Sequence, residues 1–256
     1  MKKFLSIALA LLMVCVMLPV VALAAEKTAL TYDELTNAIS TANDGDTIKL
    51  LADIDLSQTI TVNKTITLNM NGKKLYNTSE LWEKPTDDNW SLISVRGSGN
   101  LTITGNGTFA AQENDCYAVD VQGGATVTIK NGTFIGNVHA VYVLTGTANV
   151  EGGTYSVQQK YPDPAKADEF VLNCYDAHHK DGTARINVTG GTFKNFNPAN
   201  NAAEGKGNNF ADNSLVVQKN NTVQNNDFYV GNAANEVIAA ASKGEEIFVL
   251  NGTTLT

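Results

Sequence analysis

A phrase of glycine, threonine and an aromatic residue recurs four times between residues 100 and 196. Its aromatic members are Phe109, Phe134, Tyr155 and Phe193, and the glycines two positions before them are 25, 21 and 38 residues apart. Each phrase follows a short run of alternating apolar and polar residues, as in Leu101–Thr104. Self-similarity at a period of about 20–50 residues is typical of stacked repeats, so this feature constrains the fold most.

The residues between these phrases favour strands joined by tight turns. The second repeat, for example, contains the strand-like segments 117–121, 127–129 and 133–134. The intervening Asn and Gly residues tolerate left-handed backbone angles. Three short strands and one aromatic residue per repeat predict an all-β chain folded as a parallel β-helix with three strands per coil. We expect the four aromatic rings to stack inside it, where they bury a large apolar area.

The first 24 residues have the pattern of a secretory signal peptide. Lys2 and Lys3 precede an uncharged apolar run, and Ala-Leu-Ala at 22–24 favours cleavage after Ala24. An N-terminal membrane anchor is the alternative, since the run is just long enough to span a bilayer. Pro19 interrupts the run and favours the signal peptide. The sequence therefore predicts a secreted or cell-surface protein without a transmembrane segment after cleavage.

Three segments are expected in the mature chain. Residues 25–46 contain Thr31 and Glu34 in the spacing of a capping box, which predicts a short helix covering one end of the stack. Residues 47–230 are predicted to form the parallel β-helix. Residues 231–256 read as a helix followed by a strand. This last unit either caps the other end or packs on the side of the final coils.

The net charge bears on the classes of binding partner, and the cysteine positions bear on disulfide bonding. The net charge of −8 argues against nucleic acid and anionic lipid as partners. Cys116 and Cys174 do not occupy matching places in their repeats. We therefore expect free, buried cysteines rather than a disulfide bond.

A family resemblance rests on two of these features. Residues 35–50 place Leu35, Ala38, Ile39 and Ala42 at helical spacing before Gly-Asp-Thr-Ile. This segment resembles the entry unit of right-handed parallel β-helix proteins of the pectate-lyase-like superfamily. The Gly-Gly-Thr-aromatic repeats resemble those of exported bacterial and phage-associated members. The superfamily includes polysaccharide lyases, glycoside hydrolases, adhesins and tailspikes, so the resemblance implies a fold and leaves the activity open.

Catalysis of the lyase type would need a particular set of residues. The resemblance implies Asp residues that hold calcium and an Arg or Lys base. The candidates are Asp115, Asp120, Asp176 and Arg185. No local motif joins them, so we predict a non-catalytic protein without a cofactor, and calcium enters only with the lyase alternative.

Two further pairs of residues could in principle serve a metal site or a hydrolase. His178 and His179 could bind a transition metal, but adjacent residues in a loop are poor chelators, and a solvated loop is the preferred interpretation. Asp53 and Asp55 could be the paired carboxylates of a hydrolase. We expect them instead to decorate a turn.

Irregular segments are the expected sites of function, because loops on a regular scaffold commonly carry it. The segments that break the repeat are 78–90, 158–169, 176–182 and 195–213. The aromatic candidates for sugar contact are Trp82, Trp90, Tyr161 and Tyr175. The sequence thus predicts a non-catalytic exported solenoid that presents loops to a polysaccharide, a cell-surface glycan or another surface. A polysaccharide lyase or glycoside hydrolase, and a structural or fibre element, are the alternatives.

Overall fold

The computed structural model describes residues 23–159, 170–200, 210–211, 216–219, 227–241 and 247–249. The predicted signal peptide lies almost wholly outside the described residues, and so does Tyr161. Within the described part of the chain, none of the helices has the length and apolar character needed to cross a bilayer.

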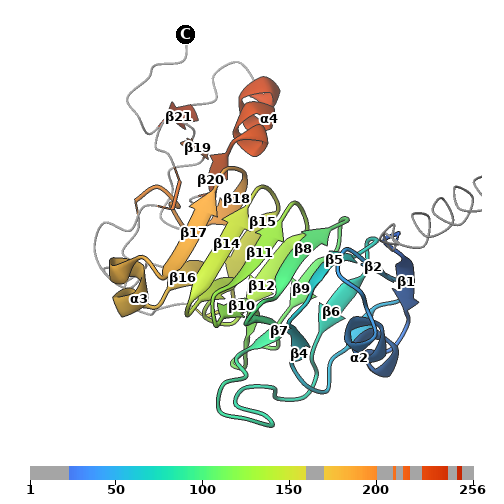
Figure 1. Cartoon of the computed structure of the whole chain (residues 1–256). Coiled ribbons are helices and arrows are strands. Elements are labelled where there is room, and N and C mark those ends of the chain that lie inside the picture. The colour runs from blue at the N-terminus through green and yellow to red at the C-terminus, as the bar shows by residue number, and fades with distance from the viewer. Residues whose placement is uncertain are drawn as a thin grey trace, which may run out of the picture.

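The strands form three sheets (Figure 1). In neighbour order, sheet A holds β1 (Glu26–Ala29), β2 (Thr47–Leu50), β5 (Thr65–Asn69), β8 (Asn100–Thr104), β11 (Ala125–Ile129), β14 (Gly146–Val150) and β17 (Ala184–Val188). Sheet B holds β21 (Ile247–Val249), β19 (Val216–Lys219), β20 (Asp227–Val230), β18 (Gly191–Lys194), β15 (Thr154–Val157), β12 (Thr133–Gly136), β9 (Thr108–Ala110), β6 (Lys74–Tyr76) and β3 (Ile54–Asp55). Sheet C holds β16 (Leu172–Cys174), β13 (Val141–Val143), β10 (Tyr117–Gln122), β7 (Ser91–Arg96) and β4 (Ile60–Val62).

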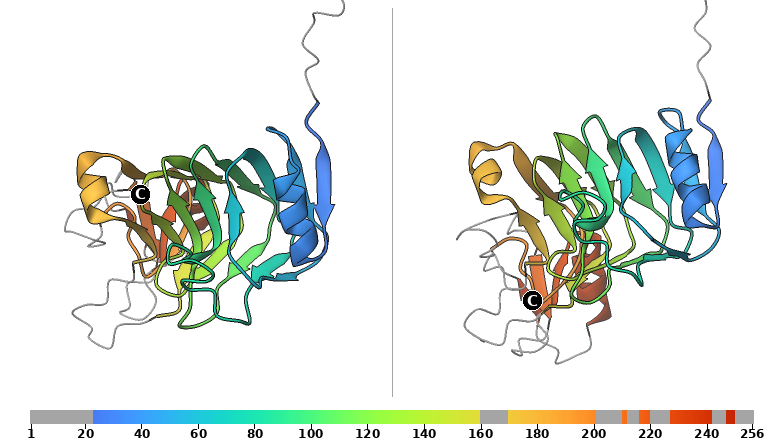
Figure 2. Two further views of the ribbon diagram at one scale, coloured as in Figure 1. Left: turned by 60° about the horizontal axis from the view of Figure 1, so that its bottom comes forward. Right: turned by 90° about the horizontal axis from the view of Figure 1, so that it is seen from below.

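Successive strands of the central region lie in different sheets. Each pairs in parallel with the strand three further along the chain: β7 with β10, β8 with β11, and β9 with β12. The chain is therefore mostly β, and its stacked parallel strands are consistent with a parallel β-helix. Figure 2 shows the stack from two further sides, with its N-terminal elements at one end and its C-terminal elements at the other.

The four aromatic residues of the repeat stack directly on one another, as predicted. Phe109, Phe134, Tyr155 and Phe193 occupy equivalent positions in neighbouring strands of sheet B. Their ring centroids are 4.7, 5.1 and 5.1 Å apart, and the planes of neighbouring rings differ by 10–13°. All four side chains are fully buried. This aromatic ladder buries a large apolar area along sheet B.

The glycine before each ring makes the sharp corner between sheets A and B. Gly153 has a φ of +99°, and a Cβ there would lie 3.0 Å from the carbonyl oxygen of Gly132. The same carbonyl accepts a 2.8 Å hydrogen bond from the backbone of Thr154. Glycine is therefore needed both for its backbone angle and for the close approach of the next chain turn.

The N-terminal helix α2 (Tyr32–Ser40) begins as predicted. Thr31 Oγ1 accepts a hydrogen bond from the Glu34 backbone at 3.2 Å, and Glu34 Oε2 accepts one from the Leu30 backbone at 2.7 Å. Its buried residues are Leu35, Ala38 and Ile39. Strand β1, which pairs in parallel with β2, was not predicted, because its four residues carry hardly any apolar signal.

At the C-terminal end the strands change direction. Strand β20 pairs antiparallel with β18, and β19 pairs antiparallel with β20 and β21. The parallel stack predicted for 47–230 thus ends at β18. Phe228 of β20 pairs with Phe193, so burial of an aromatic ring continues there although the strand runs the other way. Helix α4 (Asn232–Ala240) lies against β18 and β20. Cys116 and Cys174 are free and buried, as expected.

The aromatic ladder makes a direct prediction about stability. Replacing Phe134→Ala removes a fully buried ring between two others, and we expect the free energy of unfolding to fall by about 3–5 kcal/mol. Thr102→Ala, which changes an outward-facing side chain of β8, is the control and should alter it by less than about 0.5 kcal/mol. Chemical denaturation of the mature chain measures both. Equal losses in the two variants would contradict a stabilising role for the ladder.

Candidate functional site

The segment 78–90 folds against the outward face of sheet C, and Asp115 anchors it there. Its carboxylate accepts hydrogen bonds from the backbone N–H groups of Leu81 (2.9 Å) and Trp82 (3.0 Å), and from Asn77 Nδ2 (2.7 Å). Asp115 is buried. Its oxygens are therefore occupied by the chain itself, and this catalytic candidate has a positioning role.

Asp120 lies on the outward face of β10 but is fully buried beneath that segment. It accepts hydrogen bonds from the hydroxyls of Ser91 and Ser94 and from Gln122 Nε2, the last two at 3.0 and 2.7 Å. Burial raises the pKa of Asp120 to about 6, while these three donors act in the opposite direction. A pKa near neutrality suits a general acid, yet this carboxyl group is engaged by three donors of the protein itself.

Arg96 ties the segment to the same sheet. Its Nη1 forms an ion pair with Asp88 at 2.6 Å, its Nη2 donates to Asn89 Oδ1 at 2.8 Å, and its Nε donates to Ser94 Oγ at 2.7 Å. Gln122 Nε2 also donates to the backbone carbonyl of Asp88 at 3.0 Å. The guanidinium is thus used to hold the segment down.

Four aromatic side chains meet on this face, and together they form what we call the aromatic surface: Trp82, Trp90, Tyr117 and Tyr142. The ring centroids of Trp82 and Trp90 are 6.4 Å apart, those of Trp82 and Tyr117 are 5.2 Å apart, and those of Trp90 and Tyr142 are 6.3 Å apart. All four side chains are half-buried. The two tryptophans were predicted as ligand contacts. The two tyrosines were missed, although both stand in the strand-like segment that opens its repeat.

A buried polar pair adjoins the aromatic surface. His139 stacks on Tyr142 with ring centroids 5.3 Å apart, and its Nδ1 lies 2.7 Å from the Phe170 carbonyl oxygen. Burial lowers the pKa of His139 to about 4, so the ring is neutral and Nδ1–H donates to that carbonyl. Its Nε2 then accepts from Asn173 Nδ2 at 3.3 Å. Asn173 Oδ1 is buried and has no hydrogen-bond partner among the described residues.

The remaining lyase candidates lie elsewhere. Asp176 pairs with Lys180 at 2.5 Å on α3 (Asp176–Asp181). Arg185 is exposed on β17 of sheet A, where its Nε donates to the Gly182 carbonyl at 2.9 Å. Asp120 belongs to sheet C, so the structure does not bring it and Arg185 together.

Segment 176–182 is a helix rather than an irregular bulge. Gly182 ends it in the left-handed conformation that glycine favours. His178 Nδ1 lies 2.6 Å from the Leu144 carbonyl oxygen. His179 Nδ1 lies 3.4 Å from that of Ala184. Tyr175 is 45% exposed and packs edge-on against His178, apart from the aromatic surface.

Metal ligands do not gather in the part of the chain that the structure describes. No group of three or more His, Cys, Asp or Glu side chains there is placed to hold an ion. Asp53 accepts a hydrogen bond from the Lys74 backbone, and Asp55 accepts one from the Thr78 backbone. These two carboxylates therefore bind backbone groups of the next turn of the chain. The residues suggested for calcium do not fit a common site.

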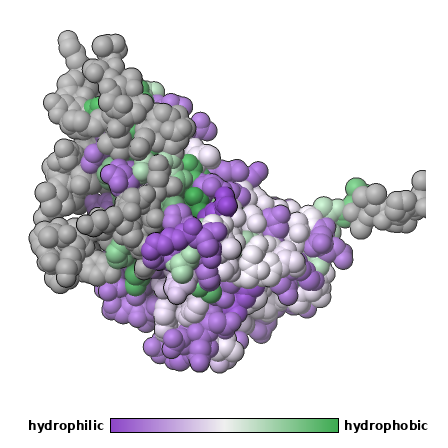
Figure 3. Space-filling model, turned by 60° about the vertical axis from the view of Figure 1, so that its left-hand side comes forward, coloured by the Kyte–Doolittle hydropathy of each residue, from purple (hydrophilic) through white to green (hydrophobic). Residues whose placement is uncertain are grey.

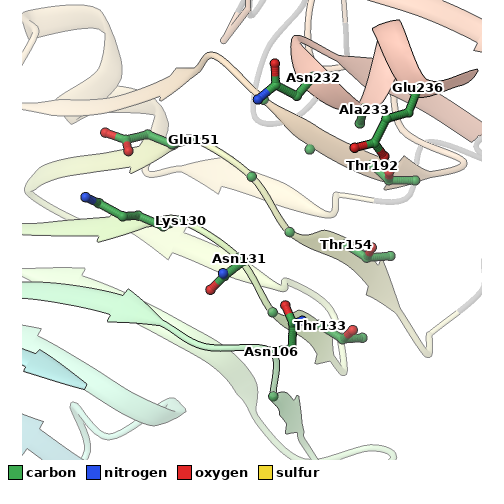
Figure 4. A pocket seen from close by; sticks show the side chains of 16 residues that line it. Asn106, Lys130, Asn131, Thr133, Glu151, Thr154, Thr192, Asn232, Ala233 and Glu236 are labelled. Carbon is green, nitrogen blue, oxygen red and sulfur yellow. The ribbon is translucent and has the colours of Figure 1, made fainter. Parts of the chain in front are cut away.

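A polar groove of about 480 Å³ follows the corner between sheets A and B and ends against α4 (Figure 4). One threonine from each of three neighbouring strands lines it, namely Thr133, Thr154 and Thr192. The other lining residues are Asn106, Gly107, Lys130, Asn131, Gly132, Glu151, Gly152, Gly153, Gly190, Gly191, Asn232, Ala233 and Glu236. No aromatic side chain lines the groove. The sequence analysis did not predict this groove, although the repeated Gly-Thr pairs line it.

The described surface on the side of the molecule that carries α3 is mostly hydrophilic or neutral, with small hydrophobic patches (Figure 3). Apart from the buried ladder, Trp82, Trp90, Tyr117 and Tyr142 form a connected group of large rings among the described residues. Comparisons with protein-family models, with curated proteins and with solved structures found no match.

The anchoring role of Asp115 can be tested by hydrogen exchange. In Asp115→Ala we expect the Leu81 and Trp82 amides to exchange about tenfold to a hundredfold faster, because a hydrogen bond to a charged acceptor contributes about 1.5–3 kcal/mol. Asp176→Ala, which breaks an exposed ion pair on α3, should leave both amides unchanged. Unchanged exchange in Asp115→Ala would show that the segment is held by other contacts.

The buried state of Asp120 predicts a pH dependence of stability. Its pKa is raised in the folded protein, so the fold favours the protonated acid and loses stability as the pH rises from about 4 to about 6. Relative to Asp120→Asn, the wild-type protein should lose about 2 kcal/mol over that range. Denaturation curves of both proteins at several pH values measure the difference. A difference that does not change with pH would contradict the burial of an ionisable carboxyl group.

Proposed function

We propose that this chain is an exported, non-catalytic β-solenoid that binds glycans through the aromatic surface. We further propose that its fold is a right-handed parallel β-helix of the pectate-lyase-like superfamily with three strands per coil. The pairing of each central strand with the strand three further along supports that coil. The signal-peptide pattern of residues 1–24 supports the proposal of export to the cell surface or the medium.

The observation that carries the proposal is the meeting of two tryptophans and two tyrosines on one face of sheet C. Aromatic rings offer flat apolar area that suits the C–H face of a sugar ring, and tyrosine and tryptophan add a polar edge. Rings that served only to fill the core would be fully buried, as those of the aromatic ladder are. These four are half-buried and adjoin polar groups, which is typical of a binding surface.

The positions of the charged candidates favour binding over catalysis. A lyase needs its base close to the carboxylates that hold the metal, whereas Arg185 and Asp120 belong to different sheets. Asp115 and Asp120 both use their oxygens in hydrogen bonds to the protein. The raised pKa of Asp120 is the one feature that favours the hydrolase alternative. For that role, the segment above Asp120 would have to move aside.

A glycan array probed with the mature protein tests the proposal. We expect retention of one group of glycans without turnover, and about tenfold or greater loss of affinity in Trp82→Ala and in Tyr142→Ala, because anchoring aromatic residues commonly dominate binding energy. Tyr175→Ala is the matched control, since this exposed ring lies outside the aromatic surface, and it should bind normally. Circular dichroism verifies that each variant is folded.

Two results would overturn glycan binding through this surface. One is an array on which the wild-type protein retains nothing. The other is undiminished binding by the folded Trp82→Ala and Tyr142→Ala variants. Release of shortened products from a retained glycan would support the enzyme alternative instead.

A further inference from the structure

We infer that the aromatic surface selects glycans that carry no acidic groups, and that it binds amine-bearing sugars most tightly. This inference rests on the proposed glycan binding and specifies the class of ligand. It follows from three properties of the residues around the rings: which cations are already paired, which carboxylates are exposed, and which hydrogen-bonding groups lack a partner.

The basic side chains next to the aromatic surface are already engaged. Lys84 is the single Lys or Arg in residues 78–90, and it pairs with Glu80 at 2.6 Å. Arg96 donates to Asp88, Asn89 and Ser94, as described above. His139 is neutral, because burial lowers the pKa of its ring to about 4. A uronate or sulfate would therefore find no unpaired cation among the described residues next to the rings, and its desolvated charge would be costly.

The exposed acidic side chains of segment 78–90 favour a ligand that carries positive charge. Glu80, Glu83, Asp87 and Asp88 lie in the eleven residues that begin at Glu80 and end at Trp90, all four are exposed, and only one lysine accompanies them. Neither Glu83 nor Asp87 has a salt bridge among the described residues. The resulting negative field repels acidic sugars and attracts ammonium groups, with a range set by the salt concentration. An ammonium group would also interact favourably with the faces of the tryptophan rings.

The free hydrogen-bonding capacity beside the rings is an acceptor. Sheet register places Asp120, Tyr142 and Asn173 side by side on neighbouring strands. Asn173 is 1% exposed, its Nδ2 faces His139, and its Oδ1 has no partner among the described residues. Such an oxygen needs a donor, either directly or through one bridging water. A hydroxyl of any sugar or the ammonium group of an amine-bearing sugar supplies such a donor, and a carboxylate placed at this point does not.

The paired cations and the exposed carboxylates disfavour an anion for different physical reasons, and the unpaired acceptor adds a place where a hydroxyl or ammonium donor binds. They also separate the chain from binders of polyuronates, which require unpaired basic residues or bound cations. The expected order of affinity for sugars of otherwise matched structure is amine-bearing above neutral, and neutral above acidic.

The test uses three β-1,4-linked hexasaccharides, namely cellohexaose, the glucosamine hexamer and the hexamer of glucuronate, together with an array that holds neutral, amine-bearing and acidic glycans of other linkages. The wild-type mature protein should retain non-acidic glycans only. Retention of amine-bearing members should weaken when the salt is raised from about 10 mM to about 1 M, because screening removes the attraction of exposed charges.

A double variant tests the source of the selectivity. Glu83→Gln with Asp87→Asn removes two exposed charges, and we expect the preference for amine-bearing over neutral glycans to fall by about fivefold. Glu151→Gln, an exposed carboxylate of the corner groove, is the control and should keep the wild-type preference. An unchanged preference in the double variant would overturn the electrostatic part of the inference.

The remaining outcomes separate the inference from the proposal on which it rests. Retention of acidic glycans at low salt, at or above the level of their neutral counterparts, would overturn the inference and leave glycan binding intact. Retention of no glycan at all would overturn both. Asn173→Ala should weaken binding of the retained glycans. Undiminished affinity in that variant would contradict a role of the Asn173 oxygen in binding.

Discussion

Register between successive turns of the chain is the constraint on which every other feature of this protein depends. The aromatic ladder fixes it on the inside, because rings about 5 Å apart stack only when Phe109, Phe134, Tyr155 and Phe193 occupy equivalent positions. The glycine corners fix it on the backbone, since a Cβ at Gly153 would press on the chain turn beside it. A shift by one residue would turn the buried rings toward solvent.

The same register determines what the outward faces can do. On sheet C it lines up Ser94, Asp120, Tyr142 and Asn173 on neighbouring strands, where segment 78–90 then covers part of the row. The covered members become structural, as their hydrogen bonds are made within the protein. The rings at the edge of that cover stay half-buried. A single inserted segment thus divides one polar row into a part that it covers and a part that lies beside the half-buried rings.

The charged side chains near the rings differ in the same way: the basic ones are paired within the protein, and several acidic ones are exposed. Arg96 holds the segment in place and Lys84 pairs with Glu80 within it, while two carboxylates of the same segment are exposed and have no salt bridge among the described residues. The corner groove under α4 has a different character, with threonine, asparagine and charged side chains and no aromatic platform. Each surface adjoins a buried amide oxygen without a partner among the described residues, Asn173 Oδ1 or Asn131 Oδ1, so the stacking area is what separates the ligands that the two surfaces would suit.

The sequence by itself determined the features that depend on local spacing: the recurring glycine and aromatic residue, the stacked rings, the capping box at Thr31 and the buried free cysteines. Only the tertiary structure decided that Asp115 anchors a segment, that Tyr117 and Tyr142 join the tryptophans, and that β20 runs antiparallel. These depend on contacts between residues distant in the chain. Periodicity specifies which side chains face inward, but it contains no information on where an inserted segment comes to rest or which way a final strand runs.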